Sequence, residues 1–323
     1  MRGFIIRRCL QIIPVFFGIL IILFMIIEIA PGDPLADLQD PRITAEERAR
    51  MLERHGLHLP IHQRFFNWVS DALRGDFGES ITHRRPVSEM IVMALPPTLT
   101  LSISAMLVSL LVGIPLGIIS AVYKGKPIDT VCTIFAFIGI SMPIFFFGVL
   151  LILLFGLNLE WTPISGFGSP PHILRNATLL EIWRDRALHL ILPVTALGLS
   201  GAAGYMRYTR ASMLEVIHSD YIRTARAKGL KERRIIFRHA LRNALLPIIT
   251  LMGLQVPFLF SGSAITEAVF GLPGLGQIMI QAVGGRNFPI IIGMMTMIAI
   301  ITLISALIAE IMYAVADPRV KYD

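Results

Sequence analysis

Six apolar stretches, each long enough to cross a bilayer as a helix, constrain this chain more than any other feature of its sequence. A membrane helix needs about 20 apolar residues to span roughly 30 Å of hydrocarbon, and its backbone polar groups must be bonded internally. The stretches cover residues 10–30, 98–122, 131–157, 188–206, 244–266 and 289–316. We therefore expect an all-α integral membrane protein with six transmembrane helices.

The composition agrees with a protein that resides in the lipid bilayer. The mean hydropathy is +0.69 and only 16% of the 323 residues are charged, against about a quarter in soluble domains. Arg2, Arg7 and Arg8 precede the first stretch, as in a signal peptide, but the stretch is longer than a signal core, so we expect a retained span. Cys9 and Cys132 lack ligand-spaced neighbours and indicate no disulfide framework or zinc site.

The distribution of Lys and Arg predicts the orientation. If the N-terminus is cytoplasmic, the inner segments hold 17 Lys and Arg, whereas the longer outer segments hold 12, together with 14 acids. The inner segments are 1–9, 123–130, 207–243 and 317–323. All five lysines fall on the inner side. Because cytoplasmic loops carry the excess of positive charge, we expect both termini in the cytoplasm of a multi-pass inner-membrane protein.

The same pattern predicts four parts of the chain. Residues 1–30 form the cytoplasmic N-terminus and first span, 31–97 an extracytoplasmic helical insertion, 98–316 the transmembrane domain, and 317–323 a cytoplasmic tail. The insertion opens with Pro31-Gly-Asp-Pro34, which stops a helix. Glycines and prolines inside the later spans predict broken helices, which a membrane tolerates beside other helices or a cavity.

A polar, basic stretch lies between the fourth and fifth apolar stretches. Ser219 or Asp220 can cap the start of a helix and Gly229 can end it in a left-handed conformation, so we expect a short helix over 220–228. From 207 to 243 there are ten Lys and Arg and three acids. Protein docking, contact with anionic lipid and nucleic-acid binding all remain open for such a surface. The small residues before Gly229 favour a protein groove.

No motif for enzymatic chemistry is evident. The chain lacks GxxxxGK[ST] and HExxH. His55, His58 and His62 have helical spacing for a metal, but neighbouring Gly and Pro favour exposed loop residues. Glu28 and Glu310 lie in apolar stretches, where acids are costly and face the interior of a bundle. We expect a structural role for Glu310, and for Glu28 either a solvated position or a place on a transport path.

The basic stretch resembles the EAA loop in the membrane-spanning permease subunits of bacterial ABC importers, in their dipeptide, oligopeptide and nickel branch. Arg223-Thr-Ala225, three residues and Gly229 carry the likeness, with Arg223 and Thr224 in place of Glu and Ala. Further matching stretches follow in order along nearly the whole chain: Ala30-Pro-Gly-Asp-Pro34, Leu73-Arg-Gly-Asp-Phe-Gly78, Arg238-His-Ala-Leu-Arg-Asn-Ala-Leu-Leu-Pro247, Glu267-Ala-Val-Phe-Gly-Leu-Pro-Gly-Leu-Gly276 and Asp317-Pro-Arg319. The likeness is to the first of the two paired permeases.

This resemblance implies a type I ABC importer fold and a transport subunit that is not an enzyme. Its partners would be a second homologous permease, two cytoplasmic ATPases that bind the ATP and Mg, and an extracytoplasmic substrate-binding protein, with no nucleic acid and no cofactor in this chain. The ATPase-coupling loop would comprise Arg223, Thr224, Ala225, Arg226, Ala227, Lys228 and Gly229. Arg226 and Lys228 would supply charge contacts, and Thr224, Ala225, Ala227 and Gly229 the docking geometry.

The sequence leaves alternatives for both the cargo and the class of function. Di- and oligopeptides are favoured, because no cluster of Cys, His or carboxylate lies along the spans. Nickel or another small solute is the alternative within the branch. From another class, the chain could be an ATP-independent channel or scaffold.

Overall fold

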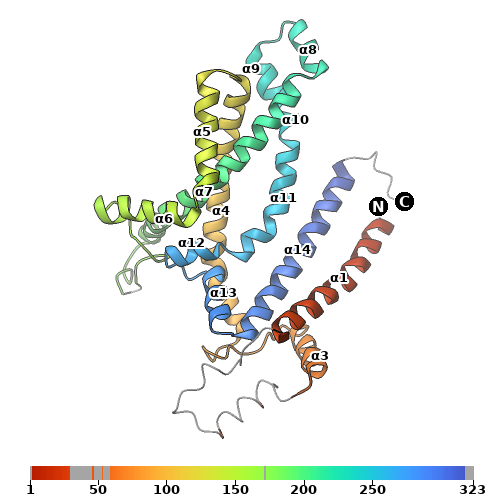
Figure 1. Cartoon of the computed structure of the whole chain (residues 1–323), viewed down its shortest axis with the longest axis vertical. Coiled ribbons are helices and arrows are strands. Elements are labelled where there is room, and N and C mark those ends of the chain that lie inside the picture. The colour runs from red at the N-terminus through yellow and green to blue at the C-terminus, as the bar shows by residue number, and fades with distance from the viewer. Residues whose placement is uncertain (1, 30–45, 47–52, 54–58, 171, 317–323) are drawn as a thin grey trace. The chain divides into compact units, whose positions relative to one another are not determined.

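The computed structural model describes residues 2–29, 46, 53, 59–170 and 172–316, and this part of the chain is built from helices (Figure 1). The earlier helices are α1 (Arg2–Ile29), α3 (Ile61–Ala72), α4 (Val87–Val122), α5 (Pro127–Ser141), α6 (Ile144–Leu151), the π-helix η2 (Ile152–Asn158) and α7 (Leu179–Ile217). The later ones are α8 (Asp220–Ala227), α9 (Glu232–Arg234), the π-helix η3 (Ile235–Ala240), α10 (Leu241–Ala244), α11 (Leu246–Ser261), α12 (Ala264–Val269), α13 (Leu275–Gly284) and α14 (Phe288–Ala316).

The apolar helices agree with six membrane spans by length and composition. Within the part of the chain that the structure describes, four helices are each long and apolar enough to cross a membrane: Arg7–Ile29, Val87–Val122, Leu179–Ile217 and Phe288–Ile308. Two bent pairs complete the set if each counts as one span: Pro127–Ser141 with Ile144–Asn158, and Glu232–Ala244 with Leu246–Ser261. The fold is therefore all-helical, as expected.

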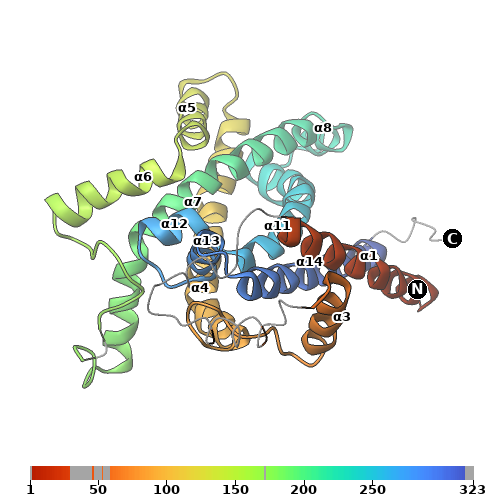
Figure 2. The ribbon, with the colours of Figure 1, turned by 60° about the horizontal axis from the view of Figure 1, so that its bottom comes forward.

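The third expected span is not one straight helix. α5 and α6 meet at an angle of 101°, and α6 projects away from α5 (Figure 2). Met142, between them, has an extended backbone (φ −80°, ψ 123°) and precedes Pro143. The ring of a proline disfavours the helical conformation in the preceding residue, so the helix must end there.

The fourth span extends at both ends beyond the expected range of 188–206. It begins after Thr178, whose side chain forms a reciprocal capping box with Glu181, an arrangement that bonds two otherwise free amides. It continues to Ile217. Arg207 and Arg210 therefore lie on a helix, and the segment 207–243 is largely helical instead of a loop.

The chain divides into two compact units, residues 1–96 with 275–323, and residues 97–274. In the first unit, α4 begins at Val87, before the expected boundary at residue 98, because its first turns bury apolar side chains against α13 and α14. The buried cluster comprises Val87, Met90, Ile91, Ala94, Leu275, Ala282, Ile290 and Met294. The buried amide of Asn287 donates to the hydroxyls of Ser80 (2.8 Å) and Thr82 (3.2 Å) and so fixes the turn before α4.

Glu28 pairs with a cation on α3. Its carboxylate lies 2.9 Å from Nη1 of Arg64, and the rings of Phe24 and Phe65 pack edge to face, 5.4 Å apart. This half-buried pair ties α1 to α3, and a place for Glu28 on a transport path stays a prediction. The side chain of Glu310 and the residues His55 and His58 lie outside the described residues.

In the second unit, α4 and α7 cross with their backbones in close contact. A Cβ added at Gly117 would lie 2.7 Å from the carbonyl oxygen of Met206 and 2.5 Å from Cβ of Thr209, and one at Gly113 would lie 2.6 Å from the carbonyl oxygen of Ala202. Small residues allow such an approach between membrane helices. This contact holds α4 against α7, and both helices also pack against α8, which is described below.

The segment expected as a turn between the last two spans contains short helices. In the second unit, α12 ends before Gly271, which has a positive φ of 59°. The carboxylate of Glu267 is fully buried and accepts a hydrogen bond from the hydroxyl of Thr98 (2.9 Å). A Cβ at Gly274 would lie 2.5 Å from Cδ of that carboxylate, so only glycine fits beside this bond.

Candidate functional site

α8 is a separate short helix at one end of the second unit, beyond η3 and α10 (Figure 1). Its N-cap residue Ser219 does not cap it through the side chain; that hydroxyl donates to the carbonyl oxygen of Val216 (2.6 Å). At its C-terminus Gly229 has φ +74°, and the amides of Gly229 and Leu230 donate to the carbonyls of Arg226 (2.9 Å) and Ala225 (3.4 Å). This pair of bonds is a Schellman motif, which ends a helix through a left-handed residue.

The two faces of α8 have different surroundings. Ile222 and Ala225, three positions apart, are buried inside the chain. Residues Arg223, Thr224, Arg226, Ala227 and Lys228 are exposed. We expected Ala225 to contribute to the docking geometry. Its spacing from Ile222 places it on the inner face, where it positions the helix and is not part of the outer surface.

The inner face of α8 joins a cluster that connects four other helical elements. Its buried members are Ile118 and Ala121 of α4, Met213 of α7, Ile222 and Ala225 of α8, Ile235 and Ala240 of η3, and Ala244 of α10. Ile222, Met213 and Ala240 have no exposed surface. Because a close-packed interior transmits displacement, movement of α8 would be passed to α4, α7 and the helices that follow α8.

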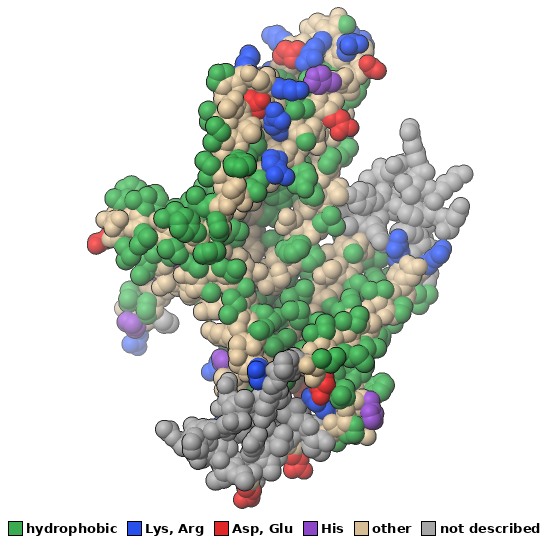
Figure 3. Space-filling view, in the orientation of Figure 1, with side chains coloured by type: hydrophobic (Ala, Val, Ile, Leu, Met, Phe, Trp, Pro, Cys, Tyr) green, Lys and Arg blue, Asp and Glu red, His purple; other side chains and the backbone are tan. Residues whose placement is uncertain are grey.

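The outer face is basic, and some of its side chains already bond to other residues of this chain. Arg226 pairs with Glu232, with Nε 2.8 Å from Oε1, although an exposed pair of this kind contributes little to stability. The hydroxyl of Thr224 donates to the carbonyl oxygen of Asp220 (2.9 Å). Figure 3 shows Lys and Arg side chains gathered over the end of the unit that carries α8 and α9.

A partly buried ion pair holds the neighbouring helix ends together. The carboxylate of Asp129 on α5 accepts from Nε and Nη2 of Arg210 on α7, both at 3.0 Å, and from the amide of Gly125 at 2.9 Å. The hydroxyl of Ser120 on α4 also bonds to Asp129. Charge-assisted bonds are the stronger kind, so this network links α4, α5 and α7 through polar contacts, beside the apolar contacts of the α8 cluster.

Replacing Ile222 with Ala should loosen α8 without unfolding the unit. Deleting a fully buried isoleucine side chain costs about 2–4 kcal/mol, and the loss falls on the contact between α8 and η3. Hydrogen–deuterium exchange of amides 222–229 in the purified subunit should speed up by more than about tenfold, while α14 is unaffected. Arg223→Ala, on the exposed face, is the matched control. Equal exchange in both variants would contradict the packing role.

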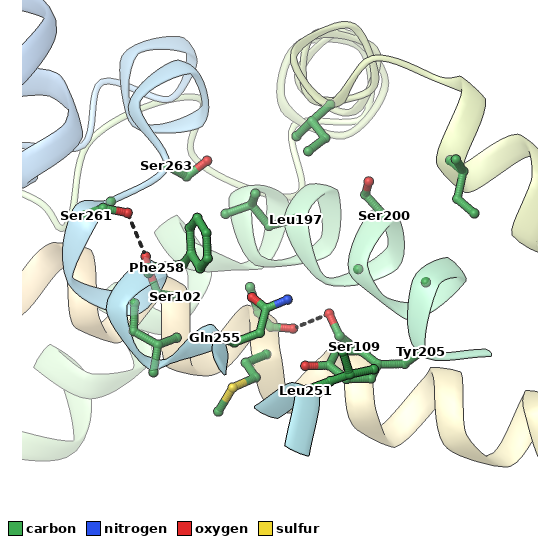
Figure 4. A pocket seen from close by; sticks show the side chains of 18 of the residues that line it. Ser102, Ser109, Leu197, Ser200, Tyr205, Leu251, Gln255, Phe258, Ser261 and Ser263 are labelled. Atoms are coloured by element: carbon green, nitrogen blue, oxygen red, sulfur yellow. Dashed lines mark hydrogen bonds between the residues drawn. The ribbon is translucent and has the colours of Figure 1, made fainter. Parts of the chain in front are cut away.

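The second unit also contains an open cavity of about 690 Å³ between α4, α7, α11 and the bend from α5 to α6. Its polar lining includes Ser102, Ser109, Ser200, Tyr205, Tyr208 and Gln255. In the view of Figure 4 the amide of Gln255 lies between Ser109 and Tyr205 on one side and Phe258 and Ser261 on the other. No sequence pattern described above singled out these residues. An isolated amide within the apolar run 246–261 was the available signal.

Comparison with known proteins identifies the class of molecule. Residues 113–322 match the family described as "Binding-protein-dependent transport system inner membrane component". The chain belongs to this family. The transport component is also similar, over 100% of its length, to curated bacterial relatives. It is 42% identical to the oligopeptide transport system permease protein AppB of Bacillus subtilis (100% of that protein) and 38% identical to the dipeptide transport system permease protein DppB of Escherichia coli K12 (99%).

Solved structures show the same fold. A crystal structure of an amino acid ABC transporter with histidines aligns with 70% of this transport component and 94% of that chain (TM-score 0.52, 18% identity). Inward-facing MetNI, a methionine ABC transporter, aligns with 71% and 96% (TM-score 0.51, 18% identity). The predicted permease family and its fold are therefore confirmed.

Membership decides several other expectations. The chain is a multi-pass transport component of an inner membrane and not an enzyme, and it carries no cofactor of its own. A binding protein and an ATPase are the partners that this family implies. The alternative of an ATP-independent channel or scaffold is therefore set aside.

Proposed function

We propose that this chain is a permease subunit of an ATP-driven importer for di- and oligopeptides. The full-length match to peptide permeases carries the proposal, at 42% identity to an oligopeptide permease and 38% to a dipeptide permease. The glutathione permease GsiC of Salmonella typhi is 35% identical over 100% of both chains, and glutathione is also peptide-like. The cargoes in these names share peptide bonds and differ in length and side chains.

The assembly would contain a second homologous permease, two cytoplasmic ATPases and an extracytoplasmic binding protein. The excess of Lys and Arg in the segments expected inside supports cytoplasmic termini and a position of α8 on the ATPase side. Residues 59–86, with α3, would then lie on the side of the binding protein. In this arrangement the loop from Arg223 to Gly229 couples the permease to the ATPase.

The packing of α8 supports a mechanical route from the ATPase to the membrane helices. Closure of the ATPase dimer on ATP would displace α8, and the cluster around Ile222 would carry that displacement to α4, α7 and α10. Alternating access requires such rigid-body movement around a site within the membrane. The exposed residues Arg223, Thr224, Ala227 and Lys228 would form the contact surface, with Arg226 held by Glu232.

Reconstitution tests this function. The complex of this chain with its second permease, ATPases and binding protein should take up radiolabelled dialanine and trialanine into proteoliposomes only when ATP is present. Omitting the ATPases should remove uptake. Uptake of nickel without peptide would favour the nickel alternative, and ATP-independent flux of peptide would contradict the proposal.

A further inference from the structure

The cavity in the second unit is mainly apolar, with several polar groups and no charge in its lining. Its lining comes from α4, α5, α6, α7, α11 and the two residues that follow α11, and contains no Asp, Glu, Lys, Arg or His among the described residues. At about 690 Å³ it falls within the range of cavities that bind small organic molecules. A lining without charge gives no reason to prefer an acidic or a basic side chain on the cargo.

Gln255 is the residue in this lining whose position is hardest to explain by packing alone. It lies in the middle of α11, in the run Leu246 to Ser261, and its side chain is exposed. Its side-chain amide makes no hydrogen bond to the described residues. A polar side chain within a membrane span is tolerated where it faces a water-filled cavity, so this exposed amide can exchange water for a polar group of a bound molecule.

The facing wall carries further polar groups. The hydroxyl of Tyr205 on α7 is buried and has no hydrogen-bond partner among the described residues. Tyr208, one turn later, is 51% exposed and also lines the cavity. Buried polar groups are nearly always bonded. The polar side chains that are accessible at this cavity on two different helices are therefore Gln255 of α11 and Tyr208 of α7, whereas the hydroxyl of Tyr205 is buried.

We propose that Gln255, together with Tyr208, binds the peptide groups of the cargo in this cavity. This inference rests on the proposed function and names the chemistry of its transport path. An amide side chain both donates and accepts hydrogen bonds, which matches the N–H and C=O that every peptide presents. Recognition of the backbone by neutral groups accommodates cargoes that differ in their side chains.

Charge placed at residue 255 tests the contact directly. In the reconstituted complex, Gln255→Glu should raise the uptake of Lys-Ala relative to Glu-Ala by about fivefold over the wild-type ratio, and Gln255→Lys should lower that ratio by about as much, because opposite charges attract across a partly wetted cavity. A structural defect would slow both peptides equally. Unchanged ratios in both variants would overturn the proposal.

Uncharged variants test the hydrogen bonds from Gln255 and Tyr208 to the cargo. They also keep the proposal testable if the charged variants fail to assemble into the complex. Gln255→Leu and Tyr208→Phe should each lower uptake of dialanine about fivefold with unchanged co-purification of the ATPases. The control is Thr250→Val on the same helix, since Thr250 donates to Leu246 within α11 and lies outside the lining. Wild-type uptake in both cavity variants would overturn the contact. Absence of peptide uptake in the wild-type complex would instead refute the proposed function.

Discussion

Replacing Gly229 with Val should abolish transport while leaving the subunit in the membrane. Gly229 ends α8 with φ +74°, a conformation that costs an L-residue about 1–2 kcal/mol and a β-branched residue more. The strain would break the Schellman bonds to Ala225 and Arg226 and misdirect α8, whose inner face still packs in the core. ATP-driven peptide uptake in proteoliposomes should fall by more than about tenfold.

A matched substitution separates backbone strain from loss of space. No heavy atom lies within 4 Å of a Cβ at Gly229, so a small side chain that tolerates the left-handed region should be accepted. Gly229→Asn should therefore retain most uptake, because asparagine adopts this conformation more readily. Normal transport by Gly229→Val, with the same amount of subunit in the complex, would contradict a coupling role for this loop.

Replacing Gly117 with Val should prevent stable folding of the second unit. The new Cβ would lie 2.5 Å from Cβ of Thr209 and 2.7 Å from the carbonyl of Met206, and both of these residues are buried. Overpacking of this kind costs about 3 kcal/mol or more, and here a backbone carbonyl is one of the obstacles. Thermal unfolding of the purified subunit in detergent should begin well below the wild-type temperature, or little folded protein should be recovered.

Gly253→Val is the matched control for that experiment. Gly253 is also helical and belongs to the same unit, but a Cβ at this position would have no heavy atom within 4 Å. The variant should unfold close to the wild-type temperature. If both variants unfold at the same lowered temperature, the loss of stability reflects helix propensity. That result would contradict a close contact between α4 and α7 at Gly117.

Local features of the chain could be predicted from the sequence because each depends on residues that are close together in the sequence. The apolar stretches predicted the spans, since length and composition alone decide whether a helix can cross a bilayer. The short helix expected over 220–228 is found as Asp220–Ala227, because a glycine in a left-handed conformation is a local stop signal. The coupling role of this helix stays a prediction.

Features that depend on contacts between residues far apart in the sequence could not be predicted in the same way. The sequence shows small residues in α7 but does not say that Gly113 and Gly117 of α4 face them, although their four-residue spacing is a known packing signal. It did not separate the inward Ala225 from the outward Ala227. It also did not show that Glu28 meets Arg64.

The sequence by itself determined that this is a helical membrane protein and which family it resembles, because periodicity, hydropathy and motif order are properties of the chain. Only the tertiary structure decided that the inner face of α8 shares one core with α4, α7 and α10 and that Gln255 opens onto an uncharged cavity. Those relations arise when helices far apart in the chain come into contact, and the energy of a contact depends on distances that no single segment specifies.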